Sequence, residues 1–200
     1  MNEFSLSSFY NQRVEEFGHH PNAVGWRSEE QQQLRFKVLL DNLAPNDMSV
    51  LDLGCGFGDF YSFLLLLGNA PSKYLGVDIS PKMIDLASKS FEHEPKVQFM
   101  KCDFFKYDFA IFDLVVLSGA LNYTQEIDKY DYLEIFIQKF SRHVSKVLSF
   151  NLLSDSVDYE QDHHQHFNID KVVVVISKYF PKVRVIRNYG LYEFTVQCAY

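Results

Sequence analysis

Three glycines stand at alternate positions of the chain, Gly54, Gly56 and Gly58, and two carboxylates, Asp52 and Asp59, frame them. An apolar run precedes this turn and a helical pattern follows it, which is the order that forms the nucleotide crevice of a doubly wound sheet. Glycine has no Cβ atom, so a ligand can lie against the backbone of such a turn. The two carboxylates would repel a pyrophosphate, but they suit a ligand that carries an ammonium and a sulfonium and no phosphate.

The spacing of these glycines distinguishes two classes of nucleotide site. Dinucleotide-binding turns usually follow the pattern G-x-G-x-x-G, whereas this chain has G-x-G-x-G. The run Asp-Leu-Gly-Cys-Gly-Phe-Gly-Asp at residues 52–59 resembles the cofactor-binding motif of the class I S-adenosylmethionine-dependent methyltransferases. The resemblance covers about residues 48–150, and it implies that S-adenosylmethionine is the cofactor.

Two further acids follow predicted strands in the order that the resemblance implies. Asp78 ends the strand 73–77, where an acid can accept hydrogen bonds from both ribose hydroxyls. Its alternative role as a helix cap is less favoured, because Ser80 already supplies that cap. Asp103 follows the next strand, and the resemblance implies that it accepts from the adenine amino group while Phe104 packs on the ring. The alternative for Asp103 is a loop turn residue.

Other residues expected at the cofactor have plainer alternatives as well. Ile79 and Met83 would lie beside the adenine, or they simply pack in the core. The Trp26 indole would make a cation–π contact with the sulfonium, or it fixes an amino-terminal arm to the domain. Small residues after the fourth strand would let the methionine part pass. The full expected cofactor set is Trp26, Asp52, Gly54, Cys55, Gly56, Gly58, Asp78, Ile79, Met83, Asp103, Phe104, Ser118 and Gly119.

Strand and helix patterns alternate along the chain and predict one α/β domain over residues 1–200. The fold is a doubly wound, seven-stranded, mostly parallel sheet with helices on both faces, and a carboxy-terminal hairpin adds an antiparallel strand. The seven strands and the antiparallel final strand are what the resemblance implies. Predicted strands cover 49–53, 73–77, 97–100, 112–117, 146–151, 183–187 and 192–199. Predicted helices begin at 28, 59, 80, 129 and 169. Residues 1–27 are expected to form an irregular arm or lid.

Composition and charge limit the partners. The chain is 47% hydrophobic and 22% charged, as in ordinary globular proteins. Its net charge of −7 makes a nucleic-acid partner unlikely, since phosphate binding needs a basic surface. Three cysteines without a C-x-x-C pair indicate neither a disulfide framework nor a zinc site, and favour the cytoplasm. We expect no membrane segment and no signal peptide. The oligomeric state is not indicated.

The acceptor side of the site is expected to lie under the arm and under the polar loop 154–166. This loop is longer than most connections and leaves the fifth strand at the ligand-binding edge. Its histidines lack the spacing of a metal site, so no metal is expected, but one of them could act as a general base. The residues most able to touch an acceptor are Tyr10, Arg13, Tyr123, Asn151, His163, His164 and His166. The chain also resembles a small, poorly characterised bacterial group of these methyltransferases, at Tyr10, Arg13 and residues 24–26, 150–154 and 191–196.

The sequence thus favours an S-adenosylmethionine-dependent methyltransferase. The segment 117–123 lacks the Asp/Asn-Pro-Pro-Tyr pattern of amino-group nucleic-acid methyltransferases, which favours a small-molecule acceptor. No catalytic residue is identified. Two alternatives stay open, namely a catalytically silent cofactor-binding or scaffold module and, less favoured, an NAD-dependent dinucleotide enzyme.

Overall fold

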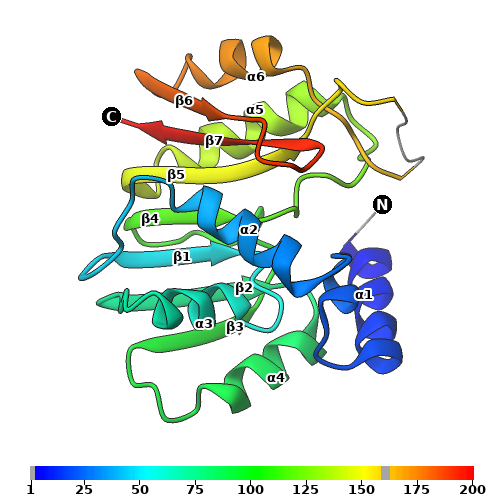
Figure 1. Cartoon of the computed structure of the whole chain (residues 1–200), viewed down its shortest axis with the longest axis vertical. Coiled ribbons are helices and arrows are strands. Elements are labelled where there is room, and N and C mark those ends of the chain that lie inside the picture. Colours follow the sequence, from blue (N-terminus) through cyan, green and yellow to red (C-terminus); the bar gives the residue numbers. More distant parts are fainter. Residues whose placement is uncertain (1–2, 159–162) are drawn as a thin grey trace.

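The computed structural model of the protein describes residues 3–158 and 163–200. Within these residues, seven strands form one sheet in the order β3-β2-β1-β4-β5-β7-β6 (Figure 1). The first five strands are mutually parallel, and β7 runs antiparallel to both β5 and β6. The strands are β1 (Ser49–Leu53), β2 (Lys73–Asp78), β3 (Val97–Lys101), β4 (Phe112–Leu117), β5 (Val144–Leu153), β6 (Lys182–Ile186) and β7 (Glu193–Ala199).

The order of the strands determines where a ligand can bind. Chain order runs outward from β1 to β3 on one side, and then crosses back to β4 on the other side of β1. The two βα connections that follow β1 and β4 therefore diverge and leave a crevice at the carboxyl ends of these strands. The predicted seven-stranded sheet with an antiparallel carboxy-terminal strand is confirmed. Strand β5 is longer at both ends than predicted.

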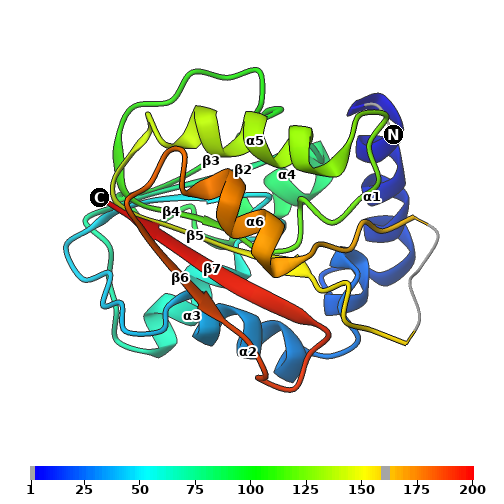
Figure 2. The same cartoon turned by 90° about the horizontal axis from the view of Figure 1, so that it is seen from above.

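Helices cover both faces of the sheet (Figure 2). On one face, α5 and α6 cover the larger apolar core, to which Phe136 and Val172 contribute fully buried side chains. On the other face, α2 and α3 cover a second core that contains Leu39 and Leu64. The helices are α1 (Glu3–Phe17), α2 (Glu29–Leu39), α3 (Asp59–Leu66), α4 (Pro81–Ser90), α5 (Lys129–Phe140) and α6 (Ile169–Ile176). In the described part of the chain, none of these helices combines the length and the apolar character needed to cross a membrane.

Local sequence signals explain where the helices near the crevice begin. The Ser28 side chain accepts from the Gln31 amide and starts α2. The Ser80 side chain accepts from the Met83 amide at the start of α4, with Pro81 at the first helical position. Both predicted caps are confirmed. Since α4 follows β2 directly, its cap fixes the residues that flank Asp78.

The amino-terminal arm differs from the prediction. It was expected to be irregular, but Glu3–Phe17 form α1 and Pro21–Val24 form a 3-10 helix, η1. The sequence of α1 has little amphipathic pattern. Several polar side chains lie on the face of α1 that packs on the domain, where they bind other parts of the chain. Figure 1 shows α1 beside the ends of β1 and β2, at the edge of the sheet where the crevice opens. The arm is therefore an ordered wall of the crevice.

Candidate functional site

A cavity of about 610 Å³ occupies the crevice at the carboxyl ends of β1, β2 and β4. This volume is in the range of pockets that enclose small-molecule ligands. Of the residues predicted from the sequence, those that line the cavity are Tyr10, Trp26, Asp52, Gly54, Cys55, Gly56, Asp78, Ile79, Met83, Asp103, Phe104, Ser118, Gly119, Tyr123, His164 and His166. The strand ends, the arm and the segment before α6 therefore meet at one place.

The glycine turn uses its own backbone amides inside the protein. The amides of Gly54 and Cys55 donate to the Val77 carbonyl, at 2.8 and 3.0 Å. The Gly56 amide donates to the Asp78 carboxylate at 3.0 Å, and the Gly58 amide donates to the Cys55 carbonyl at 3.0 Å. These four amides are therefore not available to a pyrophosphate. The turn can therefore pack against a ligand, but its amides do not form a binding site for an anion.

Asp52 faces the cavity from β1 as an almost fully buried carboxylate. The Tyr74 hydroxyl on the neighbouring strand donates to it at 2.5 Å. Burial raises the pKa of Asp52 to about 7, the Tyr74 hydrogen bond opposes this rise, and the nearby acids Asp78 and Asp59 add to it. A cationic ligand beside Asp52 would favour its ionised form.

Asp78 has a structural role in addition to the ribose contact expected for it. One carboxylate oxygen accepts from the Gly56 amide at 3.0 Å, and the other accepts from the Ser80 amide at 2.9 Å. Burial raises the pKa of Asp78, and these backbone hydrogen bonds oppose the rise. Asp78 thus joins the glycine turn to the start of α4. The carboxylate keeps at least one lone pair for a ligand that lies in the cavity.

We expect Asp78→Ala and Asp78→Asn to separate the two roles of this carboxylate. The alanine variant leaves the buried Gly56 amide without its acceptor, so it should lower the free energy of unfolding by about 1–3 kcal/mol. The asparagine variant keeps one acceptor for a backbone amide but loses the charge, so it should weaken cofactor binding about tenfold with a smaller loss of stability. Calorimetry and thermal unfolding measure the two effects. Equal cofactor affinity in all three proteins would show that Asp78 only holds the turn.

Asp103 is engaged locally as well as facing the cavity. Its Oδ1 atom accepts from the Phe105 amide at 2.9 Å, and Lys106 Nζ lies 3.2 Å from its Oδ2 atom. Phe104, the next residue, is buried and lines the same part of the cavity. Asp103 therefore makes the turn expected of a loop acid, and it also lines the cavity.

Trp26 is the centre of a contact network that the sequence did not reveal. The Arg35 guanidinium lies 3.9 Å from the centre of its ring. The ring edge also packs on Gly119, where an added Cβ atom would come within 2.6 Å of the indole. Arg35 in turn donates to Glu193 at 2.9 Å, and both side chains are buried. Thus a cation of the protein itself stacks on the indole, which supports the interpretation that Trp26 fixes the arm.

Asn151 closes this network. Its side-chain amide donates to Glu193 at 3.0 Å, and its carbonyl oxygen accepts from the Gly119 amide at 2.8 Å. Asn151 is fully buried within β5 and does not line the cavity. It was predicted to contact an acceptor, but in the structure it links β5 to β7 and to the turn that follows β4.

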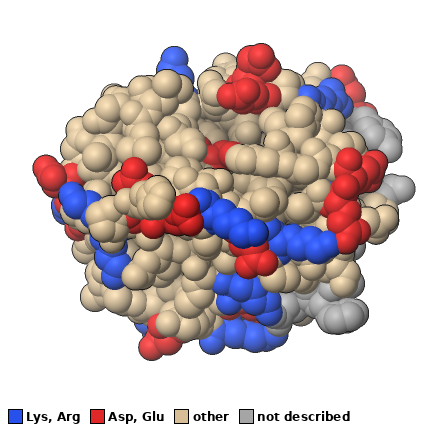
Figure 3. Space-filling model, turned by 90° about the horizontal axis from the view of Figure 1, so that it is seen from below, with Lys and Arg blue, Asp and Glu red and all other residues tan. Residues whose placement is uncertain are grey.

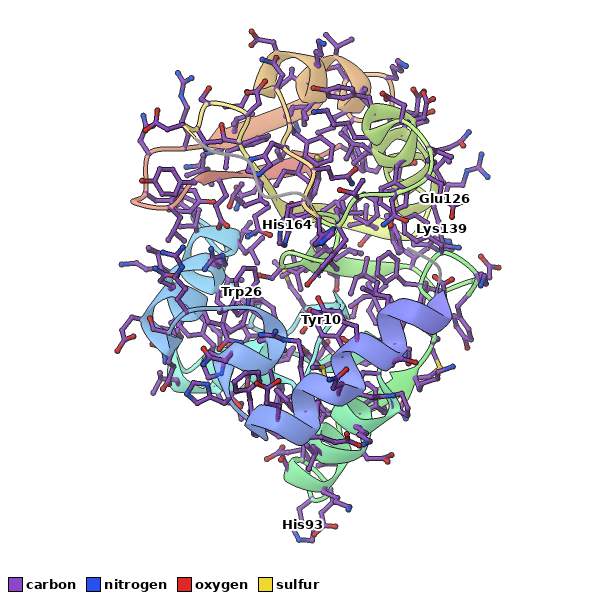
Figure 4. The ribbon with its side chains drawn as sticks, turned by 90° about the vertical axis from the view of Figure 1, so that its right-hand side faces the viewer. Tyr10, Trp26, His93, Glu126, Lys139 and His164 are labelled. Carbon is purple, nitrogen blue, oxygen red and sulfur yellow. The ribbon has the colours of Figure 1, made fainter. Side chains whose placement is uncertain are left out.

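The arm is attached to the rim of the cavity by several side chains. Ser7 Oγ donates to the Ile79 carbonyl at 3.0 Å, and Ser80 Oγ donates to Asn11 at 2.8 Å. Tyr10, between these two anchors, lines the cavity, and burial raises the pKa of its hydroxyl, with nearby Tyr123 adding to the rise. Figure 4 shows Tyr10, Trp26 and His164 around the same opening.

Three other predicted residues do not line the cavity. The Arg13 guanidinium donates to the carbonyls of Asn22 and Ala23, because α1 turns back on η1. Gly58 belongs to the turn, but its Cα faces the Phe99 ring. His163 is exposed, and its carbonyl accepts from the Thr124 amide. The acceptor contacts predicted for Arg13 and His163 are thus not supported. Part of the predicted loop, residues 159–162, lies outside the described residues.

The structure also adds residues to the site. Arg35 and Glu193 line the cavity although 158 positions separate them in the chain. Gln32 lines it as well and donates to Asp59 at 2.9 Å. His19 lies 2.7 Å from the same carboxylate, so Asp59 is already partnered by two side chains. No local sequence pattern indicates that Arg35 and Glu193 are buried or that they pair with each other. Among the described residues, no group of His, Cys, Asp or Glu could hold a metal ion.

Comparison with known proteins agrees with this architecture. Residues 50–147 match the family model of a methyltransferase domain. The chain is 26% identical over 159 residues to Rv1506c of Mycobacterium tuberculosis, which is described as a methyltransferase, and the match covers 76% of this chain and 93% of that protein.

Two solved structures share the fold over nearly the whole chain. Magnesium protoporphyrin IX methyltransferase from Synechocystis PCC 6803 with bound S-adenosylhomocysteine gives a TM-score of 0.68 at 14% identity, and covers 99% of each chain. The N-methyltransferase NodS from Bradyrhizobium japonicum WM9, in complex with the same compound, gives 0.68 at 14% identity, and covers 96% of this chain and 98% of that one. Residues 50–147 thus match a methyltransferase domain, and the motif and the fold of the chain are consistent with a class I S-adenosylmethionine-dependent methyltransferase.

Proposed function

We propose that the protein binds S-adenosylmethionine in this cavity and transfers its methyl group to a small organic acceptor. The main observation behind this proposal is the glycine turn, whose amides donate hydrogen bonds to acceptors within the protein. Three carboxylates at strand ends surround the turn, Asp52, Asp78 and Asp103. Such a site attracts a cation and offers hydrogen-bond acceptors, whereas it repels a phosphate. S-adenosylmethionine, when bound, supplies a methyl group on a sulfonium, which makes the methyl carbon electrophilic.

Two buried polar groups in the cavity support a ligand of this kind. Asp52 has a pKa of about 7 in the protein alone, so a nearby ammonium would satisfy a carboxylate that burial makes costly to ionise. Ser118 Oγ has no hydrogen-bond partner among the described residues, although it is buried and lines the cavity beside Gly119. Buried polar atoms are seldom left unpaired, and a polar ligand would provide the partner.

The surroundings of the cavity favour a small acceptor. Its walls include the rings of Tyr10, Phe104, Phe105, Tyr123 and Tyr132. On the face that Figure 3 shows, Lys and Arg alternate with Asp and Glu and do not form a continuous basic tract among the described residues. With the net charge of −7, this surface gives little attraction to nucleic acid. NodS and the Synechocystis enzyme are named for methylation, which is consistent with this class of reaction.

We expect calorimetry to show micromolar binding of S-adenosylmethionine and S-adenosylhomocysteine and no binding of NAD. The physical reason is the carboxylate ring together with the occupied amides of the turn. ADP, which has the same adenosine part and a pyrophosphate, is the matched control, and it should bind at least tenfold more weakly than S-adenosylhomocysteine. Tight binding of NAD or ADP without binding of either sulfur compound would contradict the proposal.

We further propose a reducing compartment such as the cytoplasm. The three cysteines, Cys55, Cys102 and Cys198, are free thiols, and two of them are buried. Disulfides are rare in the cytoplasm, so free buried thiols are compatible with that location.

A further inference from the structure

Unpaired polar atoms converge on the cavity from the end of β4 and from the segment that precedes α6. Among the described residues, three buried side-chain atoms have no hydrogen-bond partner, Ser118 Oγ, His164 Nδ1 and His166 Nε2. All three residues line the same cavity. An unpaired buried polar atom costs on the order of 1–3 kcal/mol, so its presence calls for an explanation. A ligand in the cavity is the explanation that covers all three.

The backbone around His166 is held in place from several sides. The amide of Gln165 donates to the Asn122 carbonyl at 2.8 Å, and the amide of Phe167 donates to the Leu153 carbonyl at 2.8 Å. Lys129 Nζ donates to the carbonyl of His166 itself. The segment is therefore extended and anchored between the ends of β4 and β5. In an extended segment, alternate side chains point to the same side, which directs His164 and His166 together into the cavity.

The hydrogen bonds of His166 define its tautomer. Its Nδ1 atom lies 2.7 Å from the carbonyl oxygen of Ser154, which can only accept. Nδ1 must therefore carry the proton, and in the neutral ring Nε2 presents a lone pair. The side chain is only 5% exposed, so Nε2 can reach a proton acceptor or donor only through the cavity. A fixed tautomer with an open lone pair is the arrangement of a general base.

We propose that His166 Nε2 is the general base of this methyltransferase and that the acceptor is a phenol. This inference rests on the proposed function. In the step, the phenolic oxygen forms a bond to the methyl carbon, and the carbon–sulfur bond breaks with its electron pair left on sulfur. The phenolic proton passes to Nε2, and the resulting imidazolium later releases it to water.

The requirement for a base separates the classes of acceptor. A carboxylate acceptor is already ionised at neutral pH and needs no base, whereas a phenol with a pKa near 10 does. The aromatic walls also fit a phenol. The Tyr10 and Tyr123 rings stand edge to face with centres 6.0 Å apart, and His164 lies 5.1 Å from Tyr123. An aromatic acceptor can extend this cluster.

Several charged and titratable groups surround His166. His163 and His164 are on its own segment, Lys129 reaches its carbonyl from α5, and Tyr123 comes from the segment after β4. Asp158, before the segment, lines the cavity as well. Burial lowers the pKa of His164, and the other two histidines add to this effect, so His164 favours its neutral form.

The decisive variant is His166→Asn. The asparagine amide can still donate to the Ser154 carbonyl, so the segment keeps its anchor, but the lone pair at the Nε2 position is lost. With S-adenosylmethionine and a panel of catechol, 4-methoxyphenol and 4-nitrophenol, we expect kcat for the first two to fall about 10²–10⁴-fold with KM nearly unchanged. The loss should be much smaller for 4-nitrophenol, which ionises without a base at pH 8. The exposed neighbour His163→Asn is the matched control and should retain wild-type rates.

Measurements besides turnover make the proposal falsifiable. Nitrogen-15 NMR of the imidazoles in the protein without ligand should show His166 protonated at Nδ1. Calorimetry should show equal S-adenosylmethionine affinity in the wild type and in His166→Asn. A proton at Nε2, an unchanged kcat in His166→Asn, or an equal loss for all three phenols would overturn the role of His166.

The panel also tests the acceptor class. Benzoic acid and aniline serve as matched carboxylate and amine probes, and we expect methylation of the phenols alone. Methylation of benzoic acid or aniline alone, or of no compound while S-adenosylmethionine binds, would overturn the phenol assignment and leave the proposed function standing. If S-adenosylmethionine does not bind to the wild type, the proposed function fails, and the role of His166 fails with it.

Discussion

Replacing Arg35 by methionine should lower the free energy of unfolding by about 3–5 kcal/mol, because it leaves the Glu193 carboxylate buried without its counter-ion. The side chains of this pair are 8% and 1% exposed, so solvent cannot compensate for the loss. Methionine retains much of the apolar stem, and the effect therefore reports the charge and its hydrogen bonds more than lost packing. Chemical denaturation followed by circular dichroism measures the change.

The same substitution should loosen the arm. The Arg35 guanidinium stacks on Trp26 and holds Glu193, while Glu193 also accepts from Asn151. The Trp26 ring then packs on Gly119 at the edge of the cavity. Without Arg35, we expect faster proteolysis between residues 18 and 28 and a red shift of the Trp26 fluorescence. Trp26 is the single tryptophan of the chain, so the fluorescence can be assigned to it.

Two further variants serve as controls for this prediction. Arg184 pairs with Asp41 on the surface, where the two side chains are 46% and 43% exposed, so Arg184→Met should cost less than about 1 kcal/mol. In the double variant Arg35→Met with Glu193→Gln, the unpaired charge is gone and part of the stability should return. A loss in Arg35→Met no larger than that in Arg184→Met would show that the buried pair contributes little.

As the pH rises toward 7, the stability of the wild type should fall and its affinity for the cofactor should rise. Asp52→Asn should remove both trends. Burial raises the pKa of Asp52 to about 7 in the folded protein, from an ordinary value of 3.8. The folded state thus holds a proton that the unfolded state has lost between these two values, and stability falls as the pH rises through this range. At about 1.4 kcal/mol for each pH unit, the wild type should lose on the order of 2–4 kcal/mol between pH 4 and pH 8 relative to the variant.

Binding of the cationic cofactor should change the protonation state of Asp52. A cationic ligand favours ionised Asp52, so binding of S-adenosylmethionine near pH 6 should release about one proton, and affinity should fall as the pH falls below 7. Asp52→Asn should remove both the proton release and the pH dependence. Calorimetry in buffers of different ionisation enthalpy measures the released protons, and thermal unfolding from pH 4 to pH 8 measures the stability.

Two variants check the sign of this effect. The Tyr74 hydroxyl donates to Asp52 and opposes the rise of its pKa, so Tyr74→Phe should raise the pKa of Asp52 further, and the loss of stability should continue to a higher pH than in the wild type. Asp113 is the opposite case, because hydrogen bonds from Ser49, Ser145 and Lys146 lower its pKa to about 2. Asp113→Asn should therefore remove stability that is present near neutral pH and is lost in acid. If stability has the same pH dependence in the wild type and in Asp52→Asn, the assigned pKa of Asp52 is wrong.

The sequence alone determined the core of the fold and one side of the site. Strand β1 has the predicted bounds Ser49–Leu53, and the caps at Ser28 and Ser80 are where they were expected. These features depend on neighbouring residues, since periodicity, caps and glycine turns are local in the chain. The three strand-end acids could be placed together for a related reason. In a parallel sheet, the carboxyl ends of the strands lie at one edge, so order along the chain is enough to predict proximity.

Tertiary structure decided the rest of the site. The helix α1 could not be predicted, since its sequence has no clear helical pattern. Its contacts with the rim residues Ile79 and Ser80, which are distant in the chain, hold it in place. The pairing of Arg35 with Glu193 joins residues 158 positions apart, and the packing of α2 against β5 and β7 brings them together. The tautomer of His166 depends on the Ser154 carbonyl, 12 positions earlier. Long-range contacts decide which polar atoms are satisfied inside the protein and which ones remain to meet a ligand, and a linear pattern does not contain that information.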